Sequence, residues 1–494
     1  MSTLRILTSP AEKRHRPARA GKVEVAELQK ELEKHVEGEV RFDRGSLGMY
    51  AVDASNYRQV PIGVVVPKTI DDVVATVGVA RKFGAPILSR GGGTSLAGQC
   101  CNTAIVMDWS KYANEILEID PVRRTARVRP GCVLDKLRNA AGKYGLTFGP
   151  DPATHNHCTL GGMLGNNSCG VHAQMAGATS NNVEAMEVLL YDGTRMKVGW
   201  LTEDEWERGI RQGGRIGDIL AALKRLRMRY ERQIRERFPP IGRRISGYNL
   251  DQLIPNAEGK INLARALVGS EGTLVTILEA ELDLVHNPPF QTLLVLGYPD
   301  VYEAGDHVQE ILEFKPMGFE GLDQELINNM KKKGLHSKHL DHLPEGKGWL
   351  MVQFPGETRE ESDGRARQLM EKLKRKRNAP SMKLYDDPAD ERAVWEVRES
   401  GLGATAFVPG EPASWPGWED AAVPTESVGE YLRDFRKLLN KHGYTAALYG
   451  HFGMGCIHCR ITFDVTSKAG LKNYRSFAKE AAELVTSYGG SLSG

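Results

Sequence analysis

Two histidines near the carboxyl end are the residues best suited to chemistry. His451 and His458 are separated by six residues within a glycine-rich stretch at 449–460. A turn between them can bring both imidazoles to one divalent metal ion, because neutral histidine nitrogen is a common ligand of transition metals. Two hydrogen-bonded structural histidines would fit the same spacing, so both interpretations stay open.

Cys456 and Cys459 form a C-x-x-C pair, which invites a zinc or redox interpretation. If residues 456–463 form a strand, side chains alternate between its two faces. Cys456 then shares a face with His458 and Arg460, whereas Cys459 faces the other way. We therefore expect the two sulfur atoms to point apart.

A glycine-rich loop at residues 90–98 follows an expected strand at 85–89. Consecutive glycines let backbone N–H groups converge on an anion without obstruction by Cβ atoms, and Thr94 and Ser95 add hydroxyl donors. A pyrophosphate suits such a loop, although a glycine-rich turn can also be purely structural. The nicotinamide-binding fingerprint does not match, since it leads straight into a helix, and residues 104–108 are strand-like.

Two further glycine clusters lie at residues 159–170 and 267–274. The first is long and apolar with amide and hydroxyl groups at one end, so it can lie against a planar ring while its backbone bonds the ring's polar edge. The second lies at the entry to a strand. Three such clusters in one β-rich region, without the nicotinamide fingerprint, favour a different dinucleotide-binding fold.

The surrounding sequence predicts the elements that position these segments. Between residues 63 and 283, short β-rich runs alternate with glycine turns and a few helices. One helix opens at Thr69, which with Asp72 forms an Asp variant of the capping box. Residues 199–240 are rich in Arg and Glu and predict an inserted surface helix.

The pattern of predicted elements changes after Pro288, where we place a domain boundary. Two strand–helix–strand units, at 292–322 and 349–385, predict a split β-α-β sheet. A β-pair across residues 449–463 carries the two histidines, and a last helix follows at 468–488.

Composition bounds the class of protein. The 494 residues are 41% hydrophobic and 26% charged, with a net charge of +2, which predicts a globular chain of two or three units and gives no electrostatic case for nucleic acid. No apolar run reaches the roughly 18–20 residues of a membrane helix. Seven scattered cysteines favour a reducing, cytoplasmic location, free or peripheral at the inner membrane face.

The order of these motifs resembles that in the vanillyl-alcohol-oxidase-type flavoproteins. It is most similar to the FAD-linked D-2-hydroxy-acid dehydrogenases of the D-lactate, glycolate and D-2-hydroxyglutarate types. The similar segments are residues 67–73, 90–98, 150–152, 159–170, 246–250 and 269–273. The resemblance implies an α+β fold, with a two-subdomain FAD-binding domain of the PCMH type and a ferredoxin-like α+β cap domain.

The resemblance also implies a division of the chain. We expect an N-terminal arm and helix at 1–40, the FAD-binding domain at 41–287 with its helical insertion at about 199–240, and the cap or substrate domain at 288–494. The chain stops at 489–494, where the family continues into a Glu-His-Gly motif that holds a metal ligand and the base. We therefore expect a truncated cap, from the flavin half of a longer FAD/iron–sulphur fusion.

By this resemblance the cofactor is FAD, bound non-covalently because the loop at 90–98 has no histidine. The implied FAD-binding residues are Arg90, Gly91, Gly92, Gly93, Thr94, Ser95, Gly98, Pro150, Asp151, Thr159, Gly161, Gly162, Asn166, Ser168, Gly170, Gly269, Glu271 and Gly272.

The resemblance assigns catalytic positions as well. Arg398 matches the arginine that holds the substrate carboxylate, a role that suits its planar fork, although a helix-surface ion pair with Glu explains it equally. His451 and His458 match the ligands of a divalent metal, zinc or manganese, and His458 is also assigned to catalysis. Trp418 stands where relatives with dicarboxylate substrates have a lysine, which favours a monocarboxylate.

The expected activity is oxidation of a small D-2-hydroxy acid, D-lactate-like, by hydride transfer to FAD. Electrons would then pass to an iron–sulphur domain or protein, an electron-transfer flavoprotein or quinone. Two alternatives stay open: another flavin oxidase of the same fold, and a non-catalytic FAD-binding electron-relay module.

Overall fold

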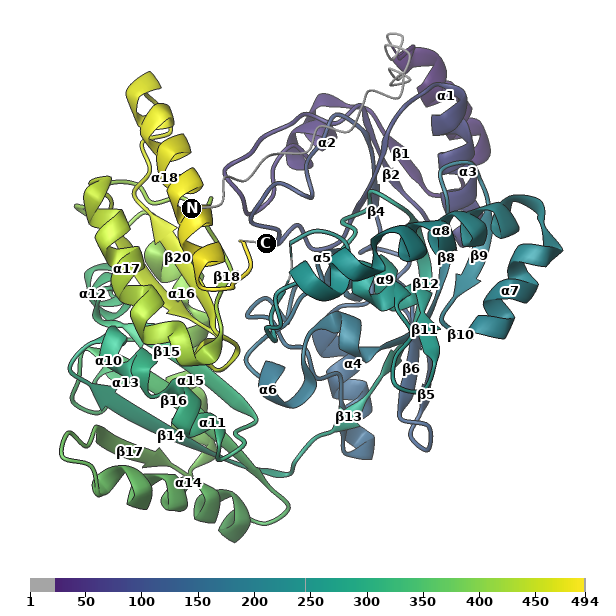
Figure 1. The fold of residues 1–494 in the computed structure, drawn as a ribbon. Coiled ribbons are helices and arrows are strands. Elements are labelled where there is room, and N and C mark those ends of the chain that lie inside the picture. Colours follow the sequence, from purple (N-terminus) through teal and green to yellow (C-terminus); the bar gives the residue numbers. More distant parts are fainter. Residues whose placement is uncertain (1–22, 245, 493–494) are drawn as a thin grey trace.

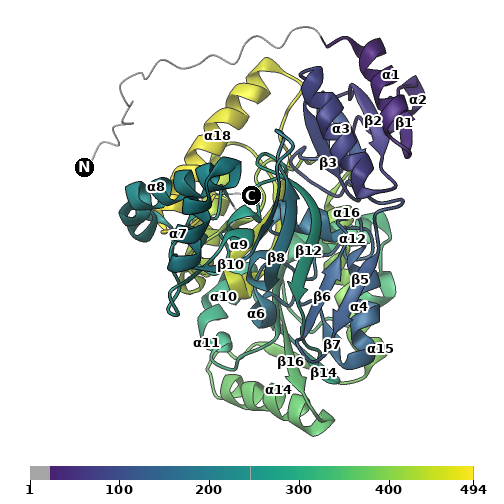
Figure 2. The same ribbon diagram turned by 90° about the vertical axis from the view of Figure 1, so that its right-hand side faces the viewer.

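The computed structural model describes residues 23–244 and 246–492 and shows two halves joined by one crossover of the chain (Figures 1 and 2). The crossover lies between β13 (Val285–His286) and β14 (Phe290–Tyr298). The arm expected at residues 1–22 lies outside the described residues. The helix expected before residue 40 is α1 (Val25–His35).

The first half begins with a four-stranded sheet of order β1-β2-β4-β3, in which β2, β4 and β3 run parallel. Helix α3 (Ile70–Lys82) packs against it, and Thr69 and Asp72 form the predicted capping box. The other elements are β1 (Glu39–Arg41), α2 (Arg44–Met49), β2 (Gly63–Val66), β3 (Ile87–Arg90) and β4 (Ile105–Asp108). The glycine-rich loop leaves the carboxyl end of β3, the edge at which open parallel sheets bind ligands.

A second, antiparallel sheet of order β5-β6-β12-β8-β9 completes this half. Helices α4, α5 and α9 contribute buried apolar side chains to its core. The elements are β5 (Ile116–Asp120), β6 (Thr125–Val128), α4 (Leu134–Ala141), β7 (Leu146–Thr147), α5 (Leu160–Asn166), α6 (Ala173–Ala176), β8 (Val183–Leu189), β9 (Arg195–Val198), β11 (Lys260–Asn262), α9 (Leu263–Leu267) and β12 (Thr276–Asp283).

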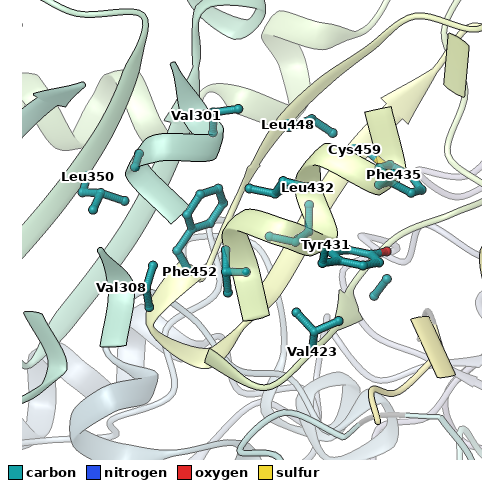
Figure 3. Close-up of a cluster of buried hydrophobic side chains, with 14 of the residues drawn as sticks. Val301, Val308, Leu350, Val423, Tyr431, Leu432, Phe435, Leu448, Phe452 and Cys459 are labelled. Carbon is teal, nitrogen blue, oxygen red and sulfur yellow. The ribbon is translucent and has the colours of Figure 1, made fainter. Parts of the chain in front are cut away.

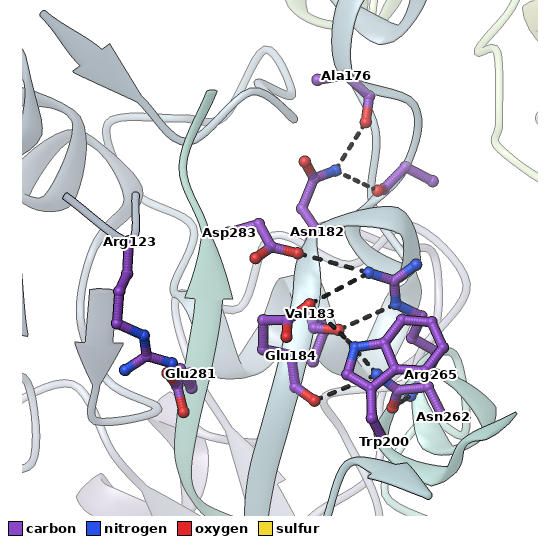
Figure 4. A network of polar contacts seen from close by, with 11 residues as sticks. Arg123, Ala176, Asn182, Val183, Glu184, Trp200, Asn262, Arg265, Glu281 and Asp283 are labelled. Carbon is purple, nitrogen blue, oxygen red and sulfur yellow. Dashed lines mark hydrogen bonds and ion pairs between the residues drawn. The ribbon is translucent and has the colours of Figure 1, made fainter. Parts of the chain in front are cut away.

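A polar network ties α9 and α6 to strand β8 (Figure 4). Arg265 Nε donates to the Val183 carbonyl at 3.0 Å, and Asn262 Nδ2 donates to the Glu184 carbonyl at 3.2 Å. Asn182 Nδ2 donates to the Ala176 carbonyl at 2.7 Å. The first two bonds satisfy carbonyls at the start of β8, where β9 does not yet pair with it, and the third ties the residue before β8 to α6.

The insertion at 199–240 differs from the single helix that we expected. It contains β10 (Trp200–Thr202) and two helices, α7 (Glu203–Gln212) and α8 (Gly214–Arg237). Gly213 has a φ of +70°, a left-handed value that glycine adopts readily, so the chain turns there. Trp206 locks the helix pair, since its ring is buried and its Nε1 donates to the Leu220 carbonyl at 2.9 Å.

The cap is built on a seven-stranded sheet of order β17-β14-β16-β15-β19-β20-β18. The first four strands have the order and antiparallel pairing of a ferredoxin-like unit, as predicted. The elements are α10 (Val301–Asp306), α11 (Val308–Leu312), β15 (Gly318–Asp323), α12 (Gln324–Lys333), α13 (Ser337–Leu340), β16 (Gly348–Gly356), α14 (Arg359–Lys374), β17 (Ser381–Tyr385), α15 (Pro388–Glu399), α16 (Gly401–Thr405), β18 (Ala421–Ala422), α17 (Val428–Lys441), β19 (Ala446–Gly450), β20 (Cys456–Ile461) and α18 (Lys468–Ser487).

The core of the cap also positions the histidine turn (Figure 3). Tyr431, Leu432 and Phe435 of α17 pack toward this sheet with Phe452, which follows His451 in the chain. A Cβ atom added to Gly321 would lie 2.4 Å from the Phe452 ring. The missing side chain at position 321 therefore lets Phe452 seat deeply and holds the turn between β19 and β20 in place.

Candidate active site

The three glycine clusters converge in the first half. Gly91 lies so close to Thr159 that an added Cβ would be 2.0 Å from its Oγ1 atom. Glu271 N–H donates to the Gly165 carbonyl at 3.0 Å, which joins the third cluster to the second. The clusters are more than 60 residues apart in sequence, so the fold has assembled one surface from them.

This surface forms one wall of a cavity of about 250 Å3, and a smaller lobe of about 80 Å3 shares several of its residues. The predicted residues that line the larger lobe are Gly91, Gly92, Gly93, Thr94, Ser95, Thr159, Gly162, Asn166, Ser168, Glu271, Arg398, His451 and His458. The smaller lobe adds Arg90, Gly161 and Gly272. Predicted cofactor and substrate residues thus face one space, supplied by both halves.

Five predicted residues line neither lobe: Gly98, Pro150, Asp151, Gly170 and Gly269. Arg90 lines only the smaller lobe and braces its own loop, because its guanidinium donates to the carbonyls of Cys100 and Val52 at 2.8 and 2.9 Å. These positions shape the backbone of the glycine clusters, and a direct role in holding FAD stays a prediction for them.

Asp151 has a different partner from the one expected. It accepts a hydrogen bond from His172 Nδ1 at 2.5 Å, and His172 Nε2 lies 2.6 Å from Gln353 Oε1 on β16 of the cap. Burial lowers the pKa of His172, but Asp151 raises it more, so the pKa lies above its usual range. Asp151 and His172 therefore form a charged pair within the first half, and the contact between His172 and Gln353 joins that pair to the cap.

The two histidines face each other at the cavity. Their ring centroids are 4.8 Å apart and the rings are nearly perpendicular, at 84°. His451 Nδ1 lies 2.7 Å from Glu320 Oε1, and His458 Nδ1 contacts Asp420 Oδ1. Within residues 23–244 and 246–492, no hydrogen bond reaches Nε2 of either ring. A carboxylate on one nitrogen, with the other left toward a cavity, is the usual arrangement of metal-binding histidines.

Arg398 is buried on α15 and shares Glu320 with His451. Its Nε and Nη2 atoms lie 2.7 and 2.5 Å from Glu320 Oε2, which leaves Nη1 for another partner. Burial raises the pKa of Glu320, but His451 and Arg398 outweigh that effect and hold the pKa below its usual range. The helix-surface ion pair considered from sequence is instead a buried pair with Glu320 of β15, and of the two residues Arg398 lines the cavity.

Two functional residues were missed from the sequence: Arg243 and Asp420. Arg243 Nη2 donates to Asp420 Oδ2 at 2.6 Å, and both side chains line the cavity. Burial raises the pKa of Asp420, but His458 and Arg243 together lower it far below its usual range. Arg243 lies just before the similar segment 246–250, and Asp420 lies two residues after Trp418, yet neither residue has a local sequence pattern that indicates its partner.

The two cysteines of the C-x-x-C pair point apart, as predicted. The Sγ atom of Cys456 lies within 4.8 Å of ligand atoms of Asp420 and His458. The Sγ atom of Cys459 instead donates to the Trp418 carbonyl at 2.9 Å. Cys456 therefore belongs to the histidine end of the cavity, whereas Cys459 belongs to the core of the cap.

Two family models match the two halves. Residues 61–199 match the FAD binding domain, and residues 287–494 match the C-terminal domain of FAD linked oxidases. The chain thus carries an FAD binding domain and an FAD linked oxidase C-terminal domain. The matches support FAD as the cofactor of the converged glycine clusters.

Similar proteins carry several names. D-2-hydroxyglutarate dehydrogenase of Haemophilus influenzae is 29% identical over 482 residues, which are 93% of this chain and 46% of that protein. Glycolate oxidase subunit GlcD of Bacillus subtilis is 28% identical over 470 residues, 93% of this chain and 86% of that protein. D-lactate dehydrogenase of Archaeoglobus fulgidus is 27% identical over 437 residues, 87% of this chain and 81% of that protein. The chain spans less than half the length of the hydroxyglutarate dehydrogenase.

Solved structures confirm the fold. A 4-ethylphenol oxidase from Gulosibacter chungangensis matches with a TM-score of 0.64 at 16% identity, over 93% of this chain and 87% of that chain. A p-cresol methylhydroxylase matches with a TM-score of 0.63 at 14% identity, over 96% and 90%. The predicted α+β architecture, a PCMH-type FAD-binding domain with an α+β cap, is therefore correct. No helix of the described residues has both the length and the apolar character to cross a bilayer.

Proposed function

We propose that this FAD-linked oxidase oxidises a small D-2-hydroxy acid, of the D-lactate type, to the 2-oxo acid. One observation supports this most directly: a single cavity combines the glycine clusters with Arg398 and the histidine pair. A 2-hydroxy acid has a carboxylate that the guanidinium of Arg398 can bind. Its neighbouring hydroxyl can bind at the two imidazoles or at a metal ion that they hold. Three of the similar proteins are named for hydroxyglutarate, glycolate and D-lactate.

The cofactor supplies the hydride acceptor, and the glycine clusters fit it because backbone at Gly91–Gly93 and the segment from Thr159 line the cavity without bulky side chains. In this chain Arg398 would bind the substrate carboxylate through Nη1, while Glu320 holds its Nε and Nη2 atoms. The substrate loses a hydride from C2 and a proton from its hydroxyl, the proton going to a general base. Arg398 thus orients C2 toward the flavin wall of the cavity.

We propose that the histidine end of the cavity holds a divalent metal. His451 and His458 would bind it through Nε2, because their Nδ1 atoms contact Glu320 and Asp420. Zinc or manganese there would polarise the substrate hydroxyl and lower its pKa. Burial lowers the pKa of His458 itself, which favours the neutral imidazole that ligates metals.

The substrate is proposed to be a monocarboxylate. Trp418 occupies the position at which we expected a lysine in dicarboxylate-oxidising relatives, and it is 6% exposed within the core of the cap. Its ring packs edge-on against Phe477, with centroids 6.5 Å apart, and so faces away from the cavity residues. This position therefore supplies no cation for a second carboxylate.

The electrons must leave the reduced flavin for a further acceptor. We propose an iron–sulphur domain or protein, an electron-transfer flavoprotein or quinone, and a cytoplasmic location, free or peripheral at the inner membrane face. Stopped-flow mixing of the reduced protein with each class of acceptor tests this assignment, since the natural acceptor should restore the flavin band fastest.

The test of the proposed function is the visible absorption spectrum of the FAD-loaded protein under anaerobic conditions. D-lactate should bleach the flavin band, L-lactate should not, and glycolate and D-2-hydroxyglutarate should be slower. Arg398→Met should slow bleaching by about 10- to 150-fold at the same, subsaturating substrate concentration, because a hydrogen bond to a charged group is lost. Arg433→Met is the matched control, because Arg433 pairs with Asp306 on the surface of the cap with 41% of its side chain exposed.

The outcomes also separate the alternatives. A flavin band that no 2-hydroxy acid bleaches would contradict the proposal and favour an electron-relay module. Bleaching by an aromatic alcohol instead would favour another oxidase of the same fold. Faster bleaching by D-2-hydroxyglutarate than by D-lactate would overturn the monocarboxylate assignment alone.

A further inference from the structure

Arg243 is a buried arginine of the FAD-binding half whose guanidinium lies against the cap. Its side chain is 6% exposed. Nη2 donates to Asp420 Oδ2 at 2.6 Å, and Nη1 donates to Cys169 Sγ. It lines the main cavity and also a neighbouring polar cavity of about 240 Å3. A guanidinium this buried is costly unless it is paired, so the pair with Asp420 defines its place.

Asp420 is held from two sides. Its Oδ2 atom accepts from Arg243, and its Oδ1 atom contacts Nδ1 of His458. The backbone of Asp420 has a φ of +55°, a left-handed conformation that costs energy for a residue with a Cβ atom. A strained backbone conformation persists only where the surrounding contacts hold it in place, and such conformations are frequent at functional sites.

Arg243, Asp420 and His458 contact one another in series across the boundary between the halves. Arg243 precedes the segment 246–250 of the first half, whereas Asp420 and His458 belong to the cap. Asp420 has two oxygens and two partners, so Arg243 occupies the oxygen that His458 does not use. The rotation of the carboxylate about its own axis is thereby fixed, and with it the direction in which Oδ1 meets the imidazole.

We propose that Arg243 is a positioning residue for the reaction at this site. By holding Asp420 it keeps a proton on Nδ1 of His458 and leaves the Nε2 lone pair toward the cavity, where a metal or substrate is bound. His458 is therefore oriented only when the two halves are seated together. The kinetic part of this inference rests on the proposed hydroxy-acid oxidation, whereas the position of the His458 proton does not.

The first experiment reads that proton directly. Nitrogen-15 NMR of histidine-labelled, FAD-loaded and metal-free protein, assigned with His458→Gln, should show His458 neutral with its proton on Nδ1. Arg243→Met should remove this signature, and Arg243→Lys should keep part of it because a cation remains near Asp420. Arg244→Met is the matched control, since Arg244 pairs with Asp251 at 2.6 Å and does not line the main cavity.

The second experiment measures zinc affinity by titrating zinc into the same metal-free proteins. Partners behind a metal-binding histidine typically change affinity by about 10–100-fold when mutated, so Arg243→Met should weaken zinc binding by that factor. Arg244→Met should leave it unchanged. With D-lactate, Arg243→Met should lower kcat more than it raises KM, because the residue acts through His458 and not on the carboxylate.

Several results would overturn the inference. One is a His458 signature that survives in Arg243→Met while that variant keeps its wild-type circular dichroism and FAD content. Another is a raised KM with unchanged kcat, which would make Arg243 a substrate-binding residue. If no hydroxy acid reduces the wild-type flavin but the NMR and zinc results appear as expected, the proposed function fails and the positioning role stands.

Discussion

Replacing Arg398 with methionine tests the buried pair at the centre of the site. The side chains of Arg398 and Glu320 are 5% and 1% exposed, so both charges are out of water. Removing one partner of such a pair costs about 3–5 kcal/mol. Because His451 still contacts Glu320, we expect about 3 kcal/mol. At about 2–4 °C per kcal/mol for a body of the cap's size, the Tm of the cap should fall by about 6–12 °C.

The same change should also reduce activity. Hydrogen bonds to a charged group contribute about 1.5–3 kcal/mol, and each 1.4 kcal/mol or so is tenfold in rate. We therefore expect kcat/KM for D-lactate to fall by about 10- to 150-fold in Arg398→Met. Steady-state reduction of an artificial acceptor measures this, alongside thermal unfolding of the same preparations.

The double variant Arg398→Met with Glu320→Gln separates the two effects. Replacing both members of a buried pair by neutral groups is often close to neutral for stability, and glutamine can still accept from His451. The Tm of the double variant should therefore recover most of the way to the wild-type value, while its kcat/KM stays as low as that of Arg398→Met. Arg433→Met, in an exposed pair, should change stability by no more than about 1 kcal/mol. Wild-type kcat/KM in Arg398→Met, or a double variant no more stable than the single one, would refute the reasoning.

Three further predictions address the rest of the site. Gly91→Ala should lower the FAD content measured by absorbance, because its Cβ would lie 2.0 Å from Thr159 Oγ1, whereas Gly78→Ala, with nothing within 4 Å, should not. Because the folded pKa of His172 is raised above 6.5 by Asp151, although burial lowers it, the stability from this link is fully present below pH 6.5 and is lost as pH rises through the raised pKa. Denaturant unfolding between pH 6 and 9 should therefore show a flatter dependence in His172→Gln, and an equal slope would contradict the link. Dialysis against a chelator should remove turnover of D-lactate but not the flavin band, and zinc or manganese should restore turnover; full activity in metal-free protein would exclude the metal role.

Local signals in the sequence were enough for much of the fold. Thr69 and Asp72 predict a helix start because a capping box involves only neighbouring residues. The glycine clusters and the histidine turn are local patterns too, and the fold brings them to one cavity. The single helix expected at 199–240 was wrong because a continuous run of Arg and Glu hides the turn at Gly213.

The partners of the site residues could not be read in this way. Glu320 lies 78 residues before Arg398 and 131 before His451, and it carries no motif. Arg243 and Asp420 are 177 residues apart and belong to different halves. Such pairs depend on how strands and halves pack, which local propensity does not encode. The link from Asp151 to the cap could not be read for the same reason, because it runs through His172 to Gln353 on a strand of the other half.

In the described part of the chain the backbone passes only once between the halves, after His286, yet polar links from Asp151 through His172 and from Arg243 to Asp420 span them. A molecule in the shared cavity touches residues of both halves, so its binding free energy stabilises their association as well as each half. Occupancy of the cavity should consequently merge two unfolding events into one cooperative transition. The bound cofactor and substrate would then hold the two halves together reversibly. In the empty protein the halves would separate more readily, and proteases would reach the chain between them.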